Sequence, residues 1–471
     1  MSFKRIFSVI FLFLLFSAAS VFGQPQQHSK GAILDEDAYN KLPRKATLAT
    51  RSYEGLPKSF SLKQYSPIPG DQSDYGTCVA WASAYAARTI SESVALNRRN
   101  QTETTQNVFS PVYVYRTINP NDPECQRGSE IYTALDLLRD SGAVRMLDIE
   151  RTLSFSSVDI SNYRESRKYP IGGYVTLFSR EDKQKPALIT RIVKKSLTEG
   201  KPVVIGMNTP NSFIEAKNIW KPTESPGRFY GGHAMCVIGY DDDKGAFEII
   251  NSWGRKWGNG GFIWIPYKTF VDFVVESYEM IENLAIFSDA VKYEGSGRIE
   301  IISRGAARTA ALTLTQEGYY KTSEAFTQGT QFRFIVGASE NAYVYSFAVS
   351  QPARNNNFYS PALLFPPAGV SPLLNYRDSA VAIPAEDNVL ELDAESGMEY
   401  IITLYSKQPL EIQLIMRRFI SGKGNIKERL TSALGSNNLL SPSYKQAEAS
   451  FSVTTDDSRA VAALIVAVEH K

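Results

Sequence analysis

The chain of 471 residues is longer than one ordinary domain, so two or three domains are expected. Its content of 43% hydrophobic and 12% aromatic residues is typical of well-buried cores and excludes an intrinsically disordered chain. The 51 basic residues nearly balance the 49 acidic ones, so charge gives no reason to expect nucleic acid or an anionic membrane as a partner.

The first 23 residues, MSFKRIFSVIFLFLLFSAASVFG, are predicted to be a secretory signal peptide. Lys4 and Arg5 form a positive start, residues 6–16 an apolar run, and residues 21–23 a small-residue cleavage site. The alternative is an uncleaved membrane anchor, but the apolar run is short for a span of about 20 residues. We therefore expect an exported protein (secreted, periplasmic or at the cell surface) that is not stably inserted in a membrane once the signal is cleaved.

Residues 24–56 are polar and show no hydrophobic period, which is typical of a short pro-segment or linker. Residues 57–288 then combine predicted helices and strands. Small and apolar residues without Gly or Pro predict a largely buried helix over 78–96, and an amphipathic helix is predicted over 187–200, ended by Gly200. Predicted strands, separated by Gly and Asp turns, follow at 201–208, 233–242, 246–253 and 261–267. Helices early and strands late predict an α+β domain.

Residues 289–471 are predicted to form an all-β, sandwich-like domain. Short alternating runs between turns predict its strands, at 297–305, 307–316, 331–339, 342–350, 388–397, 399–407, 410–419 and 460–470. One short helix is expected at 424–436, with Ile426, Leu430 and Leu434 on one face.

Cys78 has the surroundings that a nucleophilic thiol requires. It follows Gly76 and Thr77 and begins the predicted buried helix, so the helix dipole and free backbone N–H groups are expected to favour the thiolate. A cysteine that only packs at a helix start is the alternative. The two other cysteines are expected in a loop (Cys125) and as a small hydrophobic residue in an apolar strand (Cys236).

A nucleophilic thiol also needs a base, and His233 is the one histidine inside the globular part, because the other two lie near the ends of the sequence. Asn251 ends a strand one hairpin away, so neighbouring antiparallel strands could bring it to His233 as an orienting acceptor. Trp253 could cover their hydrogen bond from water. Gln72, six residues before Cys78, could supply a side-chain amide to a developing oxyanion.

Three stretches, DQSDYGTCVAWA, GGHAMCVIGYDD and EIINSWGRKWGNGGFIWIPY, together resemble the papain-like cysteine peptidases. The resemblance covers residues 56–287, roughly half of the chain. It implies a two-lobed α+β fold, with a helical lobe and a β-barrel-like lobe, and a cysteine-type peptidase activity without a cofactor.

The resemblance also implies a role for each matching residue. Cys78 would be the nucleophile, His233 the general base and then acid, Asn251 the orienting residue and Gln72 the oxyanion-hole donor. Substrate contacts would come from Gly128 and Ser129 in the segment GSEIYTAL, from Gly232 and from Trp253. A pocket for a substrate side chain is expected near residues 206–208 and Ala234.

The sequence departs from the family pattern at three places. Val79 replaces the usual aromatic residue after the nucleophile. Tyr75 replaces a cysteine, so the usual nearby disulfide cannot form and Cys125 would be its unpaired partner. The long helical propeptide is absent, because residues 24–56 are too short for it, so any latency must arise differently. The pattern resembles the bacterial branch of the family.

Residues 310–415 resemble an uncharacterised β-rich module that occurs beside secreted peptidase domains. The similar stretches are FRFIVGASENAYVYSFAVS, LLFPPAG and VAIPAEDNVLELDAESGMEYIITLYS. The resemblance implies no function. A contact with substrate or the cell surface is one interpretation, and structural packing against the peptidase domain is the other.

The sequence thus predicts an exported thiol endopeptidase that hydrolyses proteins or peptides through an acyl-enzyme intermediate. An acyl transferase or transpeptidase could use the same groups. A further alternative is a catalytically weak papain-like scaffold that binds or adheres through its β-rich region. No metal is predicted, because His and Cys spacings typical of metal sites are missing, and no other cofactor or nucleic acid is expected.

Overall fold

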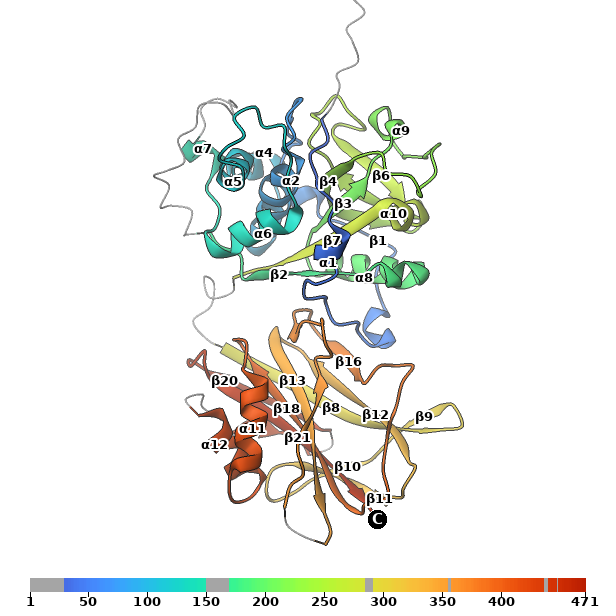
Figure 1. The fold of residues 1–471 in the computed structure, drawn as a ribbon, viewed down its shortest axis with the longest axis vertical. Coiled ribbons are helices and arrows are strands. Elements are labelled where there is room, and N and C mark those ends of the chain that lie inside the picture. Colours follow the sequence, from blue (N-terminus) through green and yellow to red (C-terminus); the bar gives the residue numbers. More distant parts are fainter. Residues whose placement is uncertain (1–28, 150–168, 284–290, 355–356, 436–438, 447) are drawn as a thin grey trace, which may run out of the picture.

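The structure is a computed structural model that describes residues 29–149, 169–283, 291–354, 357–435, 439–446 and 448–471. The predicted signal peptide lies outside these residues. Figure 1 shows an N-terminal part (29–283) with helices beside a sheet, and a C-terminal part (291–471) made mostly of strands. Within the described ranges, no helix has the length and apolar character needed to cross a membrane.

The buried helix predicted over 78–96 is present at the centre of the N-terminal part. It consists of α2 (Cys78–Ala80), a π-helix (Trp81–Arg88) and α3 (Thr89–Ala95), and its first sixteen residues, through Ser93, are buried. Other helices of this lobe are α4 (Gln101–Gln106), α5 (Pro111–Ile118), α6 (Ile131–Asp140) and α7 (Met146–Ile149). The small residues of the buried helix let α5, α6 and two strands approach it from different sides.

The second lobe of the N-terminal part is a seven-stranded sheet of order β2-β7-β3-β4-β5-β6, with β1 also pairing with β4. Its strands are β1 (Ser59–Ser61), β2 (Gly173–Thr176), β3 (Val203–Asn208), β4 (Gly232–Asp241), β5 (Ala246–Ile250), β6 (Phe262–Pro266) and β7 (Val274–Ile281). The predicted amphipathic helix is α8 (Pro186–Thr198), which ends before Gly200 at φ +77°. Helices α9 (Asn211–Ile214) and α10 (Tyr267–Phe273) complete the lobe.

The C-terminal part contains two seven-stranded sheets. One has the order β10-β11-β21-β18-β13-β14, with β15 beside β13, and the other has the order β16-β12-β8-β20-β19, with β17 and β9 at its edges. Alternate residues of β21 (Val461–His470), such as Leu464 and Val466, join the core shared with the second sheet. The intervening residues, such as Ala463 and Ile465, pack beneath two helices. This alternation confirms the predicted sandwich-like architecture.

The remaining strands of the C-terminal part are short or moderate in length. They are β8 (Val291–Ser303), β9 (Ala306–Thr309), β10 (Leu312–Leu314), β11 (Tyr320–Phe326), β12 (Gln331–Ala338), β13 (Ala342–Pro352), β14 (Ala362–Phe365), β15 (Leu373–Leu374), β16 (Ser379–Ile383), β17 (Leu390–Glu391), β18 (Gly397–Ser406), β19 (Ser443–Tyr444) and β20 (Ser450–Thr455). The strand predicted over 388–397 is therefore largely wrong, because within this range only the two residues of β17 and Gly397, the first residue of β18, pair.

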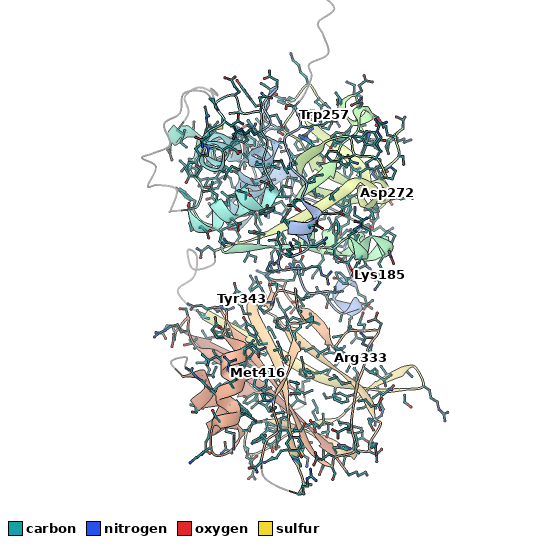
Figure 2. The ribbon with its side chains drawn as sticks, viewed as in Figure 1. Lys185, Trp257, Asp272, Arg333, Tyr343 and Met416 are labelled. Atoms are coloured by element: carbon teal, nitrogen blue, oxygen red, sulfur yellow. The ribbon has the colours of Figure 1, made fainter. Side chains whose placement is uncertain are left out.

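The strand predicted over 410–419 is also wrong, because these residues belong to helix α11 (Ile412–Ser421). Ile412, Ile415, Met416 and Phe419 recur at helical spacing, and the last three are buried against the outer face of the first sheet. The predicted short helix is confirmed as α12 (Ile426–Leu434), which begins with a capping box between Asn425 and Glu428. Figure 2 shows Met416 within the C-terminal part, on α11.

Residues 29–56, predicted to be a polar pro-segment or linker, are built into the fold. After helix α1 (Glu36–Tyr39), residues 43–53 run between the two parts of the molecule and end in a short 3₁₀-helix (Thr50–Tyr53) (Figure 1). They are here called the seam strand, although they form only isolated β-bridges, at Arg44. Arg44 pairs with Thr176 of β2 on one side and with Val370 of the C-terminal part on the other. A cavity of about 680 Å³ lies beside the seam strand, lined from both parts by residues that include Lys185 (Figure 2) and Glu386.

Candidate active site

Cys78 is fully buried at the start of its helix, where that helix packs against β4. Its Sγ accepts the backbone N–H of Ala234 at 3.4 Å and that of Gly31 at 3.3 Å. Because Ala234 follows His233 on β4, the thiol lies beside the predicted base. The contact with Gly31 brings a segment from the N-terminal end of the described chain to the same sulfur.

His233 and Asn251 meet as the pairing of β4 with β5 predicts. His233 Nε2 lies 2.8 Å from Asn251 Oδ1, and the same oxygen accepts the backbone N–H of Ser252 at 2.8 Å. A neutral imidazole that donates through Nε2 carries its lone pair on Nδ1, so this hydrogen bond selects the tautomer that a general base requires. The Trp253 ring stacks on the imidazole, with ring centroids 4.5 Å apart, and covers the pair.

Gln72 is buried, and its side-chain amide is hydrogen-bonded at both its oxygen and its nitrogen. Oε1 accepts the hydroxyl of Ser252 at 2.6 Å, so the remaining atom, Nε2, is the donor that faces the site. Nε2 donates to the carbonyl oxygens of Tyr75 at 2.8 Å and of Ser29 at 3.1 Å. A preoriented amide donor of this kind is suited to binding a developing oxyanion.

Residues 29–34, here called the cleft segment, occupy the groove between the two lobes. Ser129 donates its N–H to Gly31 O at 2.8 Å and accepts the N–H of Ile33 at 3.0 Å, while Gly232 O accepts the N–H of Ala32 at 3.1 Å. The pairing of Ala32 with Ser129 is parallel. Ser129 and Gly232, predicted to hold substrate backbone, thus hold backbone of the chain itself.

The glycines of the site are required by this close approach. A Cβ on Gly232 would lie 2.1 Å from Ala32 O, and one on Gly128, at φ +74°, would lie 2.4 Å from Gly31 O. Neither contact leaves room for a side chain. Cys125 and Cys236 are buried, in a loop and in β4 as predicted, and the three cysteines, all within the described ranges, are unpaired. No group of three or more His, Cys, Asp or Glu among the described residues could hold a metal ion.

Comparison with known proteins assigns the domain that carries this site. The family model for papain family cysteine proteases matches residues 56–281. The chain contains a papain-family cysteine peptidase domain. The α+β, papain-like fold and the cysteine-type peptidase class predicted from the resemblance are thereby confirmed.

Two curated relatives and one solved structure illustrate the similarity. An uncharacterized peptidase C1-like protein of Acanthamoeba polyphaga mimivirus is 28% identical over 228 residues, which are 45% of this chain and 70% of the relative. A cysteine protease of Blomia tropicalis is 22% identical over 241 residues, covering 48% and 65%. Xylellain, a cysteine protease from Xylella fastidiosa, superimposes with a TM-score of 0.43 at 21% identity, covering 56% of this chain and 99% of its own.

Cys78 was expected to be a thiolate, and its surroundings in the structure favour the neutral thiol instead. The N–H groups of Ala234 and Gly31 favour the thiolate, as a helix start was expected to do, but burial outweighs them and raises the pKa of Cys78 to about 11. The expected thiolate is therefore wrong for this arrangement. The physical reason is the cleft segment, which lies on the sulfur and leaves Cys78 fully buried.

The cleft segment also places a side chain beside Gly206 of the peptidase domain. A Cβ on Gly206 would lie 2.7 Å from Leu34 Cδ2, 3.2 Å from Ile131 Cδ1 and 3.4 Å from Glu276 Cβ, so all three side chains lie close to this glycine. The pocket expected near residues 206–208 and Ala234 stays a prediction.

Glu276 was missed by the sequence analysis, although an acidic residue inside the apolar strand VVESYEMI is a signal for it. The side chain is buried, and its carboxylate accepts the backbone N–H of Asp35 and the hydroxyl of Tyr278, each at 2.9 Å. Burial outweighs these hydrogen bonds and raises the pKa of Glu276 from 4.5 to about 7.

Replacing Glu276 with Gln is expected to flatten the pH dependence of stability. The folded protein binds this proton more tightly than the unfolded chain, so the free energy of unfolding should fall as the pH rises from 4.5 through about 7. Gln mimics the protonated carboxyl and removes that slope. Thermal unfolding of both proteins across this pH range measures the difference, and parallel profiles would contradict the assignment.

Proposed function

We propose that this protein is an exported thiol endopeptidase in which Cys78, His233, Asn251 and Gln72 carry out the reaction. The observation that supports it most directly is the 2.8 Å contact between His233 Nε2 and Asn251 Oδ1, which the stacked ring of Trp253 covers. Ala234, the residue after His233 on β4, donates its backbone N–H to Cys78 Sγ. An oriented base beside a thiol at a helix start is the arrangement that activates a cysteine nucleophile.

In the proposed reaction, His233 takes the proton of Cys78, and the sulfur forms a bond to the substrate carbonyl carbon. The carbonyl oxygen becomes an oxyanion that accepts hydrogen bonds from Gln72 Nε2 and the backbone N–H of Cys78. His233 then gives the proton to the amine that leaves, and the C–N bond breaks. Water, deprotonated by His233, attacks the thioester carbon, the C–S bond breaks, the acyl part leaves with a carboxyl group, and His233 returns the proton to the sulfur.

The path of the cleft segment favours an endopeptidase. Ser29 O accepts from Gln72 Nε2, the N–H of Gly31 lies on Cys78 Sγ, and Leu34 lies beside Gly206, so a continuous stretch of chain passes over the thiol. Export is supported by the predicted signal peptide, and hydrolysis of proteins or peptides by the family of the domain. An acyl transferase would use the same four residues. An assay with added free amines separates the two reactions, because a transferase joins the acyl group to the amine, whereas a peptidase releases it as a carboxylate.

The test is hydrolysis of a peptide library by a chain whose cleft is open, made by replacing Gly31 with Leu. That chain is expected to cut internal peptide bonds, and the same chain with Cys78→Ala is expected to have no activity. Adding Gln72→Ala instead should lower kcat by about 10²–10³-fold, because one oxyanion donor is lost, while Cys78 still reacts with an epoxide inhibitor. An open chain that labels at Cys78 but cuts no peptide would contradict the proposal and favour a binding role.

A further inference from the structure

The cavity beside the seam strand lies where the two parts of the molecule meet, and its size suits a small ligand. Its volume of about 680 Å³ falls within the range of about 300–1,000 Å³ that is typical of ligand pockets, which are common at domain interfaces. The lining comes from the seam strand, from the start of α8 and from residues 365–370 and 381–387 of the C-terminal part. Most of these residues are apolar, so the few charged and hydrogen-bonding groups decide what can bind.

The α8 side of the cavity carries two positive charges. Arg191 lines the cavity, and its Nε is buried with no hydrogen-bond acceptor among the described residues. The Arg191 guanidinium lies 5.7 Å from the ring centroid of Tyr53, a contact that positions the cation without neutralising it. Lys185, labelled in Figure 2, precedes α8 and is exposed. Neither cation forms an ion pair within the part of the chain that the structure describes.

Two of the three acidic residues in the lining already have partners. Asp182 pairs with Arg44 at 3.4 Å, and the Glu386 carboxylate accepts N and Oγ1 of Thr50 at 2.9 and 2.6 Å. The third, Asp387, is exposed and belongs to the C-terminal part, away in sequence from the α8 cations. α8 also begins without a side-chain cap, so the positive end of its dipole adds to the two cations. A carboxylate is the group that this side of the cavity suits.

The edge of β16 offers backbone groups to the same cavity. Ala380 uses its outward groups already, because its O accepts Ala49 N at 2.8 Å and its N–H donates to Ser52 Oγ at 3.1 Å. Outward groups recur at every second residue of an antiparallel strand, so the N–H and C=O of Ala382 point the same way. Ala382 lines the cavity, and no other described residue hydrogen-bonds to these two groups. A free edge of this kind pairs with an extended backbone.

We propose that this cavity binds a short, extended peptide that ends in a free α-carboxylate. Arg191 and Lys185 hold the carboxylate, the peptide backbone pairs with Ala382, and apolar side chains of the peptide pack against residues such as Leu188 and Val370. The volume of the cavity limits the ligand to a few residues. Short peptides with a new carboxylate are what peptide-bond hydrolysis releases, but binding at this site does not depend on the proposed peptidase function.

The test is calorimetric titration of the full chain carrying Cys78→Ala, so that the probe cannot be cut. The probe is an N-acetylated tripeptide of valine, alanine and leucine with a free carboxylate, compared with the same peptide as its C-terminal amide. The acid is expected to bind, and the amide to bind at least about tenfold more weakly. Arg191→Gln should weaken binding of the acid about 10- to 100-fold, because hydrogen bonds to a charged group are lost. Arg308→Gln, at an exposed arginine outside the cavity, is the matched control and should bind as the parent does.

Ala382→Pro tests the backbone pairing, because it removes one outward N–H at an edge position where proline is tolerated. It should weaken binding of the acid and the amide alike. Thermal unfolding without peptide shows whether each variant is folded, and if Arg191→Gln is not, Lys185→Gln at the exposed neighbouring cation takes its place.

Equal binding of acid and amide, or equal affinities of the Arg191→Gln and Arg308→Gln chains, would overturn the inference. Binding of inorganic phosphate without binding of the peptide would show a simple anion site and would also overturn it. Adding Gly31→Leu, which opens the cleft, should leave the Arg191-dependent affinity unchanged, and loss of that dependence would place the peptide in the cleft instead. All of these chains lack Cys78, so failure of the proposed peptidase function would not alter the result.

Discussion

Replacing Gly31 with Leu is expected to make Cys78 react with iodoacetamide at pH 7 about a thousand times faster. A Cβ on Gly31 would lie 2.0 Å from the carbonyl oxygen of Gly76 and 2.6 Å from its Cα. Gly76 cannot yield easily, because its N–H donates to Cys125 O at 2.7 Å within the folded domain. The cleft segment must therefore move away from the sulfur.

The size of this effect follows from the pKa of the thiol. With the cleft segment in place, burial holds the pKa of Cys78 at about 11, so only about one thiol in ten thousand is ionised at pH 7. Once water and the imidazole reach the sulfur, the pKa should fall into the range of about 3.5–7.5 that is typical of cysteines activated by histidine or a helix start. A pH profile of alkylation rate measures the shift directly.

The matched control is Ile33→Ala in the same segment. The Ile33 side chain is 44% exposed, and its backbone bond to Ser129 does not depend on the side chain, so the cleft should stay closed. Equal alkylation rates for the parent and the Gly31→Leu chain would show that the cleft segment does not shield Cys78.

Replacing Glu279 with Ala is expected to lower the free energy of unfolding by about 3–5 kcal/mol, because it leaves a buried ammonium group without its counter-charge. Glu279 is fully buried, pairs with the ammonium group of Lys45 and accepts hydrogen bonds from the hydroxyl groups of Tyr376 and Ser196. Its strand, β7, lies in the peptidase domain, whereas Lys45 and Tyr376 come from the seam strand and the C-terminal part. Urea unfolding followed by fluorescence is the measurement, and the loss should appear in the transition that separates the two parts.

An exposed ion pair provides the comparison for this variant. Arg308 and Glu324 lie 2.6 Å apart with side chains 55% and 48% exposed, and such pairs contribute about 0–1 kcal/mol. Glu324→Ala should therefore leave the unfolding midpoint nearly unchanged. Equal midpoints for the Glu279→Ala and Glu324→Ala chains would contradict the importance of the buried cluster.

The contribution of Glu279 to stability is expected to depend on pH in the acid range. Burial alone would raise its pKa, but the ammonium groups of Lys45 and Lys201 outweigh burial and lower the pKa from 4.5 to about 2. Its contribution to stability is therefore complete above about pH 4.5 and is lost as the pH falls through about 2.

The sequence predicted His233 and Asn251 as partners because the strand and turn pattern between them is short and local. The runs that form β4 and β5 are strongly apolar and bounded by turns, so a hairpin was the natural prediction, and it brings the side chain of His233 within reach of Asn251, which follows β5. The order of strands in the sheets and the π-helical middle of the buried helix depend on contacts between distant residues, which periodicity does not report. Residues 410–419 were mistaken for a strand because their apolar positions fit both periods.

The cleft segment shows a different limit of sequence reasoning. It is held mainly through backbone groups, such as Gly31 O and the N–H groups of Ala32 and Ile33, and any residues can present such groups. Residues 24–56 therefore look like a polar linker, although part of them fills the cleft and part joins the two domains. Lysine side chains are mostly exposed in proteins, and only the tertiary structure reveals that Lys45 is buried against Glu279.

The place of β21 in its sheet has a consequence for the order of events during synthesis. This strand follows every other described strand along the chain, yet it lies inside the sheet between β11 and β18, paired with both. The sandwich cannot close until β21 has left the ribosome, by which time the peptidase domain and its cleft segment are already outside. We therefore expect that, in nascent or C-terminally truncated chains, the seam strand lacks the hydrogen-bond partners that the C-terminal part supplies, such as Gly369 and Ser371.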